Sequence, residues 1–251
     1  MTLFFDLETT GLDPDTARIV ELAALDAREA GGRAGAAARQ LTHHRRFHPE
    51  TPIPPEASRV HGITDADVAD APRFRERAAD VQALFEERTL CGYNLRAFDT
   101  PLLDAELRRA DQPGLDLEAV REIDLYRVWT AIEPTEGRGY RTLTSAVERY
   151  LDRFHEGAHA APDDVLVLPE LLTEMRAEHG LDEEEMVELS APPEEVDRAG
   201  KLRREGGEVV FAFGRHAGEP VADRPDYVDW MLRTDFPRET KRILRRLREE
   251  G

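Results

Sequence analysis

Cysteine, lysine and long apolar runs are scarce in this sequence of 251 residues, which has one cysteine, Cys91, and two lysines, Lys201 and Lys241. A single cysteine excludes a disulfide framework and a metal centre built from cysteines. No apolar run approaches the roughly 18 residues that a membrane-spanning helix requires. The N-terminus also lacks a basic segment followed by an apolar stretch, which is the pattern of a signal peptide. These absences predict a cytoplasmic protein with no membrane partner.

Positive charge is scarce as well, with 52 acidic against 34 basic residues and a formal net charge of −18. Such a chain should repel nucleic acid over most of its surface. If it acts on a polyanion, a local feature such as bound divalent cations must overcome that repulsion. The acid excess fits a salt-rich cytoplasm, and it fits equally a solubility-enhancing surface encoded by an arginine-favouring, G+C-rich genome.

Charge also divides the chain. Residues 182–197 hold eight acidic and no basic side chains, which indicates a linker or a solvated acidic helix. Residues 198–251 are different, since 13 basic side chains there outnumber 10 acidic ones. We therefore expect a first domain over residues 1–180, an acidic linker over 181–205 and a small C-terminal module over 206–251.

Apolar patterns in the first domain alternate between strand and helix. Strands are expected at residues 3–7, 19–26, 40–47 and 90–93, and one more ends at residue 123. Helices are expected at residues 74–85, around 102–107, at 125–132 and at 143–151. This order predicts an α/β domain with a mixed sheet flanked by helices. In the module, a strand at 208–213 and helices at 227–233 and 237–250 predict a small α+β unit.

Acidic side chains stand at the ends of three of these segments. Asp6 and Glu8 end an apolar strand, and residues two apart in a strand point to the same face. Asp99 follows a later strand, and His159 stands five residues before Asp164 near the start of a helix. Neighbouring carboxylates at the end of a buried strand repel one another unless a cation lies between them. Each segment alone fits ordinary loop residues, but the three together favour a site.

The three segments resemble, in order, the three sequence blocks of the DEDDh 3′–5′ exonuclease family. This family of proofreading, DNA polymerase III epsilon-like exonucleases has an RNase H-like fold. Asp6 and Glu8 match the first block, Asp99 the second, and His159 with Asp164 the third. The resemblance covers about residues 1–178, and the segment after residue 206 resembles a small module appended to some bacterial members.

Two positions depart from the family pattern. Tyr93 stands where the family usually has a histidine, at a position that is not a metal ligand. Pro169 falls where the family continues a helix, so we expect that helix to kink or restart.

The resemblance implies metal-dependent chemistry. Asp6, Glu8, Asp99 and Asp164 are expected to share two divalent ions, Mg²⁺ or Mn²⁺, whose hardness suits carboxylate oxygens. Two such ions, about 3.5–4 Å apart, can activate water and stabilise the leaving oxygen. His159 is expected to take the proton from the attacking water, because an imidazole titrates near neutral pH.

A further set of residues is expected to contact substrate, with local structural roles as the alternative: Thr9, Thr10, Leu12, His61 and Asn94. The family implies that Glu8 and the backbone after it hold the terminal 3′-hydroxyl, with Leu12 as an apolar wedge beside the last bases. Arg96 and Arg141 are candidates for phosphate contact, although most arginines are solvated surface residues.

The implied function is hydrolysis of DNA, or RNA, from the 3′ end to release nucleoside 5′-monophosphates. The partners would be single-stranded or frayed DNA 3′ ends, with RNA and a polymerase or repair protein as further candidates. The alternatives are a 3′–5′ exoribonuclease of the oligoribonuclease or RNase T type, and a non-catalytic end-binding or polymerase-associated module. No residue of the pattern selects between the two sugars.

Overall fold

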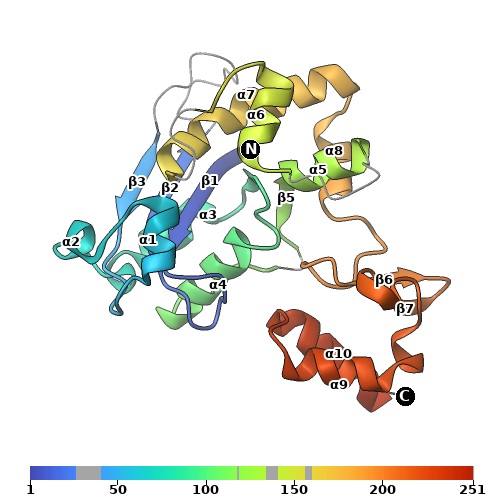
Figure 1. Ribbon diagram of the computed structural model, residues 1–251. Coiled ribbons are helices and arrows are strands. Elements are labelled where there is room, and N and C mark those ends of the chain that lie inside the picture. The colour runs from blue at the N-terminus through green and yellow to red at the C-terminus, as the bar shows by residue number, and fades with distance from the viewer. Residues whose placement is uncertain (27–40, 118, 134–140, 156–159, 251) are drawn as a thin grey trace. The chain divides into compact units, whose positions relative to one another are not determined.

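The first part of the chain forms a five-stranded mixed sheet, as expected. The computed structural model describes residues 1–26, 41–117, 119–133, 141–155 and 160–250 (Figure 1). The strand order is β3-β2-β1-β4-β5. Strands β1 (Thr2–Thr9), β2 (Ile19–Asp26) and β3 (His43–Arg46) pair antiparallel, while β4 (Thr89–Gly92) and β5 (Arg121–Asp124) continue parallel to β1.

Helices cover both faces of this sheet. One face carries α3 (Ala78–Phe85) and α4 (Asp99–Arg109). The other carries α5 (Leu125–Ile132), α6 (Leu143–Leu151), α7 (Ala161–His179) and α8 (Glu183–Ser190). Two short helices, α1 (Pro55–His61) and α2 (Asp65–Val68), and a 3₁₀ turn at Phe74–Glu76 stand between β3 and α3. Figure 1 shows α7 lying across β1 and β2.

The alternation of β1 decides where its acids point. Phe5 packs in the core on the α3 and α4 side, whereas Phe4 packs with Val165 of α7 on the opposite side. Because side chains alternate along a strand, Asp6 and Glu8 share the α7 face with Phe4. The first turn of α7 is therefore the element that meets them.

Helix α7 runs through Pro169 without the expected restart. A proline inside a helix removes one backbone hydrogen bond, and its ring crowds the preceding turn. The buried side chains of Leu168, Leu171 and Leu172 hold the helix against the sheet on both sides of the proline. Among the described residues, no helix combines the length and the apolar character needed to cross a bilayer.

The chain divides into two compact units, Met1–Ser190 and Ala191–Gly251. The division falls inside the stretch 181–205, where a linker is expected, and residues on both sides of the division are folded. Helix α8 buries Met186, and the Asp124 amide donates to the Ser190 hydroxyl across 2.8 Å. The buried carboxylate of Asp197 accepts from the amides of Lys201 and Leu202, each at 2.7 Å.

The second unit has its own apolar core. It contains a hairpin of β6 (Leu202–Glu205) and β7 (Glu208–Phe211), 3₁₀ turns at Gly214–His216 and Val221–Asp223, α9 (Pro225–Arg233) and α10 (Arg238–Glu250). Its core includes Leu202, Phe211, Val228, Met231 and Leu244. The sequence pattern missed β6 because three of its four residues are charged.

Candidate active site

Three of the predicted acids meet at the end of β1. One carboxylate oxygen from each of Asp6, Glu8 and Asp164 lies within 4.8 Å of the others. Asp6 and Glu8 come from β1, and Asp164 comes from the first turn of α7, where a helix end favours an anion. Glu8 and Asp164 are each only 9% exposed.

Asp99, the fourth acid, is held against the same strand. Its Oδ1 accepts a hydrogen bond of 3.1 Å from the amide of Leu7, which lies between Asp6 and Glu8 in sequence. Strands β4 and β1 approach closely nearby, since a Cβ at Gly92 would stand only 3.0 Å from the Phe5 carbonyl oxygen. This close approach of β4 to β1 brings the following turn, and α4 after it, to the acids.

Asp124, a residue that the sequence analysis did not single out, fixes that turn. Its buried carboxylate accepts from the amides of Asn94 at 2.8 Å and of Arg96 at 3.1 Å, and also from Tyr126 at the start of α5. Asp124 ends β5, and its carboxylate bonds to the turn that follows β4. These bonds fix the direction in which the chain enters α4. The signal in the sequence is an acid directly before a helix, which is an ordinary N-cap pattern.

Burial and mutual repulsion raise the pKa values of Asp6, Glu8 and Asp99. Burial raises the pKa of Glu8 from 4.5 to about 8, and the charges of Asp164, Glu21 and Asp99 add to the effect. Burial likewise raises the pKa of Asp99 to about 8, against the opposing Leu7 hydrogen bond. The pKa of Asp6 is raised well above its ordinary value by burial first and then by its acidic neighbours. The protein itself therefore supplies little positive charge to balance the ionised forms of these carboxylates.

Glu21 is the fifth acid of this neighbourhood. It lies opposite Glu8 in the pairing of β1 with β2, where like charges destabilise. Its carboxylate, however, has partners, since the Arg46 Nε lies 2.8 Å away and the His44 Nε2 lies 3.0 Å away. Glu21 is thus paired with side chains of the neighbouring strand, whereas no basic side chain is bonded to Asp6, Glu8 or Asp99 among the described residues.

The chemistry of this donor set fits divalent cations. Mg²⁺ and Mn²⁺ bind through carboxylate oxygens, and an ion among these side chains would relieve both the burial cost and the repulsion. A second group, Glu133, Glu178 and His179, also brings its ligand atoms within 4.8 Å. There the Arg149 guanidinium lies 2.7 Å from Glu133 and 2.5 Å from Glu178, so an ion-pair network already occupies the place of a cation.

The histidine nearest to the acids in the described structure is His155. Its Nε2 lies 2.5 Å from Asp164 Oδ1, and its side chain is buried. The predicted general base, His159, lies outside the described residues. Sequence reasoning missed His155 because the family pattern assigns the histidine five residues before Asp164, whereas His155 stands nine residues before it.

The predicted substrate-binding residues Thr9 and Thr10 make local hydrogen bonds in the turn after β1. The Thr9 hydroxyl donates to the Gly11 carbonyl at 2.6 Å, and the Thr10 hydroxyl accepts from the Arg18 amide at 2.9 Å, so both threonines stabilise the turn after β1. Leu12 on that turn is 78% exposed. Asn94 is also exposed and adopts φ of 62°, a left-handed turn conformation that asparagine tolerates.

His61 lies at the end of α1, close to the backbone of Thr9. Its Nδ1 accepts from the Ile63 amide at 3.0 Å, and its buried Nε2 finds no hydrogen-bond partner among the described residues. Burial lowers the pKa of His61, an effect that the Thr9 backbone partly opposes. A neutral imidazole with one ring nitrogen left over is suited to meet a polar group of a ligand.

The two candidate phosphate-binding arginines each bond to groups of the protein. Arg96 forms a buried ion pair of 2.6 Å with Glu122. Arg141 donates to the carbonyl of Trp129 at 2.7 Å and lies over its ring. Tyr93, the departure in the second block, donates to the Arg141 carbonyl at 3.0 Å. These contacts give each of the three side chains a partner within the protein.

Comparison with known proteins identifies the family. A family model described as Exonuclease (RNase_T) matches residues 3–172. The chain belongs to this exonuclease family. DNA polymerase III subunit epsilon of Treponema pallidum is 34% identical over 175 residues, covering 70% of this chain and 76% of that protein. Exodeoxyribonuclease 10 of Escherichia coli is 25% identical over 237 residues, covering 92% and 90%.

Solved structures agree on the fold. Escherichia coli Exonuclease I in complex with a dA16 oligonucleotide matches with a TM-score of 0.55 at 20% identity. The match covers 70% of this exonuclease and 40% of the Exonuclease I chain. The predicted membership in the DEDDh family and the predicted RNase H-like mixed sheet are confirmed. The protein is thus an exonuclease that acts on nucleic acid.

Proposed function

We propose that this exonuclease degrades DNA from the 3′ end with the help of two divalent metal ions and releases nucleoside 5′-monophosphates. The observation that supports the proposal most is the buried cluster of Asp6, Glu8, Asp99 and Asp164. Burial and repulsion raise the pKa of Asp6, Glu8 and Asp99 in this cluster. These four residues would hold Mg²⁺ or Mn²⁺. When bound, the ions supply Lewis-acid activation of water and stabilisation of the leaving oxygen.

The remaining residues bind the 3′ end and move a proton. Glu8 and the backbone at Thr9 and Thr10 hold the terminal 3′-hydroxyl, and Leu12, which projects into solvent, lies against the last base. His61 offers its free Nε2 to the substrate strand. His159 takes the proton from the attacking water. His155 is the second candidate for that role, because it reaches Asp164 directly.

DNA is the favoured substrate, since the relatives include an exodeoxyribonuclease and polymerase III epsilon subunits. Epsilon relatives also support association with a polymerase, which co-purification would test.

The main experiment incubates the full chain with 3′-labelled single-stranded DNA and RNA oligonucleotides of equal sequence, with Mg²⁺, Mn²⁺ or a chelator.

The expected result is metal-dependent release of labelled mononucleotide in the first turnover, faster from DNA than from RNA. Faster release from RNA would replace the proposal by an exoribonuclease. Binding of the 3′ end without release under any metal would support the non-catalytic alternative and reject the proposal.

A further inference from the structure

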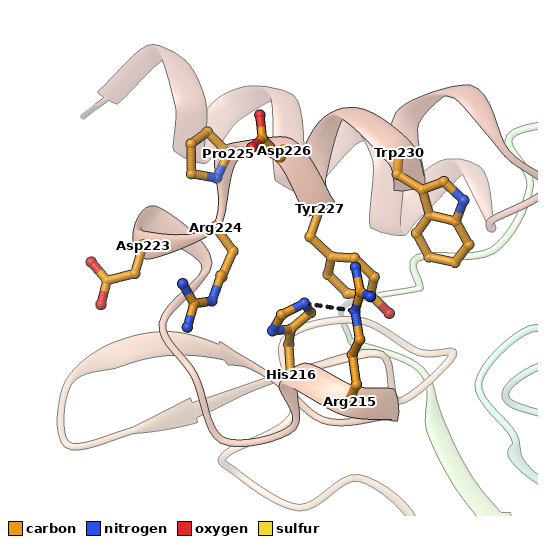
Figure 2. Close-up of a pocket in the computed structure, with 8 residues that line it drawn as sticks. All are labelled: Arg215, His216, Asp223, Arg224, Pro225, Asp226, Tyr227 and Trp230. Atoms are coloured by element: carbon orange, nitrogen blue, oxygen red, sulfur yellow. Dashed lines mark hydrogen bonds between the residues drawn. The ribbon is translucent and has the colours of Figure 1, made fainter.

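The C-terminal unit contains a pocket of about 770 Å³ with an aromatic wall, and its lining residues are drawn in Figure 2. Tyr227 and Trp230, one turn apart on α9, stack with ring centroids 5.0 Å apart and planes inclined by 17°. Trp230 is 44% exposed, although large aromatic side chains contribute most when they are buried. The unit's core is formed by other residues, such as Phe211 and Met231. The exposed indole is therefore a surface available to a ligand.

An arginine is held beside this wall by a chain of hydrogen bonds. The Arg215 Nε donates to His216 Nε2 at 2.9 Å (Figure 2). The His216 Nδ1 lies 3.0 Å from a carboxylate oxygen of Glu219. Because Nε2 accepts, Nδ1 carries the proton that is donated to Glu219, and this carboxylate fixes the tautomer. The Arg215 guanidinium lies 5.8 Å from the centroid of the Tyr227 ring.

Arg215 differs from the other arginine of the pocket. Arg224 forms an ion pair with Glu219, whereas no carboxylate pairs with Arg215 among the described residues. The terminal nitrogens of Arg215 thus remain available in a preset orientation. A guanidinium with free terminal nitrogens suits a phosphate, which it can bind through two parallel hydrogen bonds.

We propose that this pocket binds one nucleotide of a single-stranded nucleic acid, with the base stacked on Trp230 and the phosphate on Arg215. Aromatic side chains are the usual stacking surface for unpaired bases. Asp223 and Asp226 also line the pocket, so charge alone would not hold a polyanion there. This proposal rests on the proposed function, because the proposed function is the reason to expect a single-stranded nucleic acid as the ligand.

Binding can be measured through the indole itself. The chain has two tryptophans, and Trp129 is buried in the first unit, so quenching by a ligand reports on Trp230. The full chain, kept in chelator to prevent cleavage, is titrated with a dT12 oligonucleotide and with a duplex of equal length. The two pocket variants are Arg215→Gln and Trp230→Leu. Because Trp230→Leu lacks the reporting indole, its binding is measured by the fluorescence anisotropy of a labelled oligonucleotide. Arg233→Gln is the matched control, because Arg233 is exposed on α9 but bonds to its own helix at Asp229.

We expect dT12 to quench the fluorescence and the duplex not to. Each pocket variant should weaken binding on the order of tenfold, since stacking of one base accounts for about that factor. Arg215→Gln should also lower the slope of log affinity against log salt by about 0.7, the contribution of one phosphate contact on a single strand. Arg233→Gln should bind as the wild type does.

Equal binding by the wild type, Arg215→Gln and Trp230→Leu would overturn the inference. So would quenching by a basic peptide in place of dT12, which would identify a cation as the ligand. Hydrolysis of a dinucleotide separates this inference from the proposed function, because the pocket variants should leave that rate unchanged. If the protein hydrolyses the dinucleotide but the pocket variants bind dT12 as the wild type does, the pocket proposal alone is refuted. If dT12 quenches the Trp230 fluorescence but the protein hydrolyses no dinucleotide, the pocket proposal is supported and the proposed nuclease chemistry is refuted.

Discussion

Replacing Glu8 by glutamine should make the metal-free protein less sensitive to pH. Burial raises the pKa of Glu8 from 4.5 to about 8 in the folded protein, whereas the unfolded chain keeps the ordinary value. Between these values the folded protein binds more protons than the unfolded chain, so the free energy of unfolding falls as pH rises. At about 1.4 kcal/mol per pH unit, Glu8 alone should remove about 2–4 kcal/mol between pH 5 and pH 8, after allowance for relaxation.

Urea unfolding in chelator at pH 5 and pH 8 measures this loss in the wild type and in Glu8→Gln. The matched control is Glu174→Gln, because Glu174 is exposed on α7 and far along the helix from its first turn. The wild type and the control should lose stability over this interval, and Glu8→Gln should lose less by the stated amount. Mn²⁺ should restore the wild type most at pH 8, where metal ions compete with fewer protons. Equal losses for wild type and Glu8→Gln would refute the account of the cluster.

Three other predictions concern the base, the C-terminal unit and the second-block turn. His159→Ala should lower turnover by about 10²–10⁴-fold and remove the acid limb of the pH–rate profile, while His155→Ala should keep that limb. If only His155→Ala loses it, the base is His155. A chain truncated after Ser190 should keep its chemistry but show a higher KM on long substrates at low salt, and the difference should shrink as salt rises. Equal KM values would make that unit a docking or structural piece. Arg96→Ala should destabilise the protein by about 3–5 kcal/mol, because it leaves Glu122 buried without its ion-pair partner. A loss below about 1 kcal/mol in urea unfolding would show that the pair is solvated.

The strands of the five-stranded sheet and the direction of the acids were predictable from the sequence. A short apolar run must be buried, and the period of two then places Asp6 and Glu8 on one face without any knowledge of the neighbours. Helices at residues 125–132 and 143–151 also have the expected bounds, because their apolar spacing is regular.

Other features depend on partners distant in sequence. Helix α8 of the acidic stretch is packed because Met186 lies in the apolar core of the first unit. The local sequence pattern does not reveal this packing. Arg96 and Arg141 are of a residue type that is usually solvated at the surface, yet each bonds to an acceptor of the first unit. The role of Asp124 arises only when β4 and β5 lie side by side.

The central claim is that the acids at the end of β1 hold the metal ions on which hydrolysis depends. Asp164 and Asp163 are neighbours at the start of α7, but Asp164 is buried in the cluster and Asp163 is exposed. The most direct measurement is the rate of mononucleotide release from 3′-labelled single-stranded DNA in Mn²⁺ by Asp164→Asn and Asp163→Asn. The account predicts a loss of about 100-fold or more for Asp164→Asn and a change of no more than about twofold for Asp163→Asn. Equal rates for the two variants would contradict it.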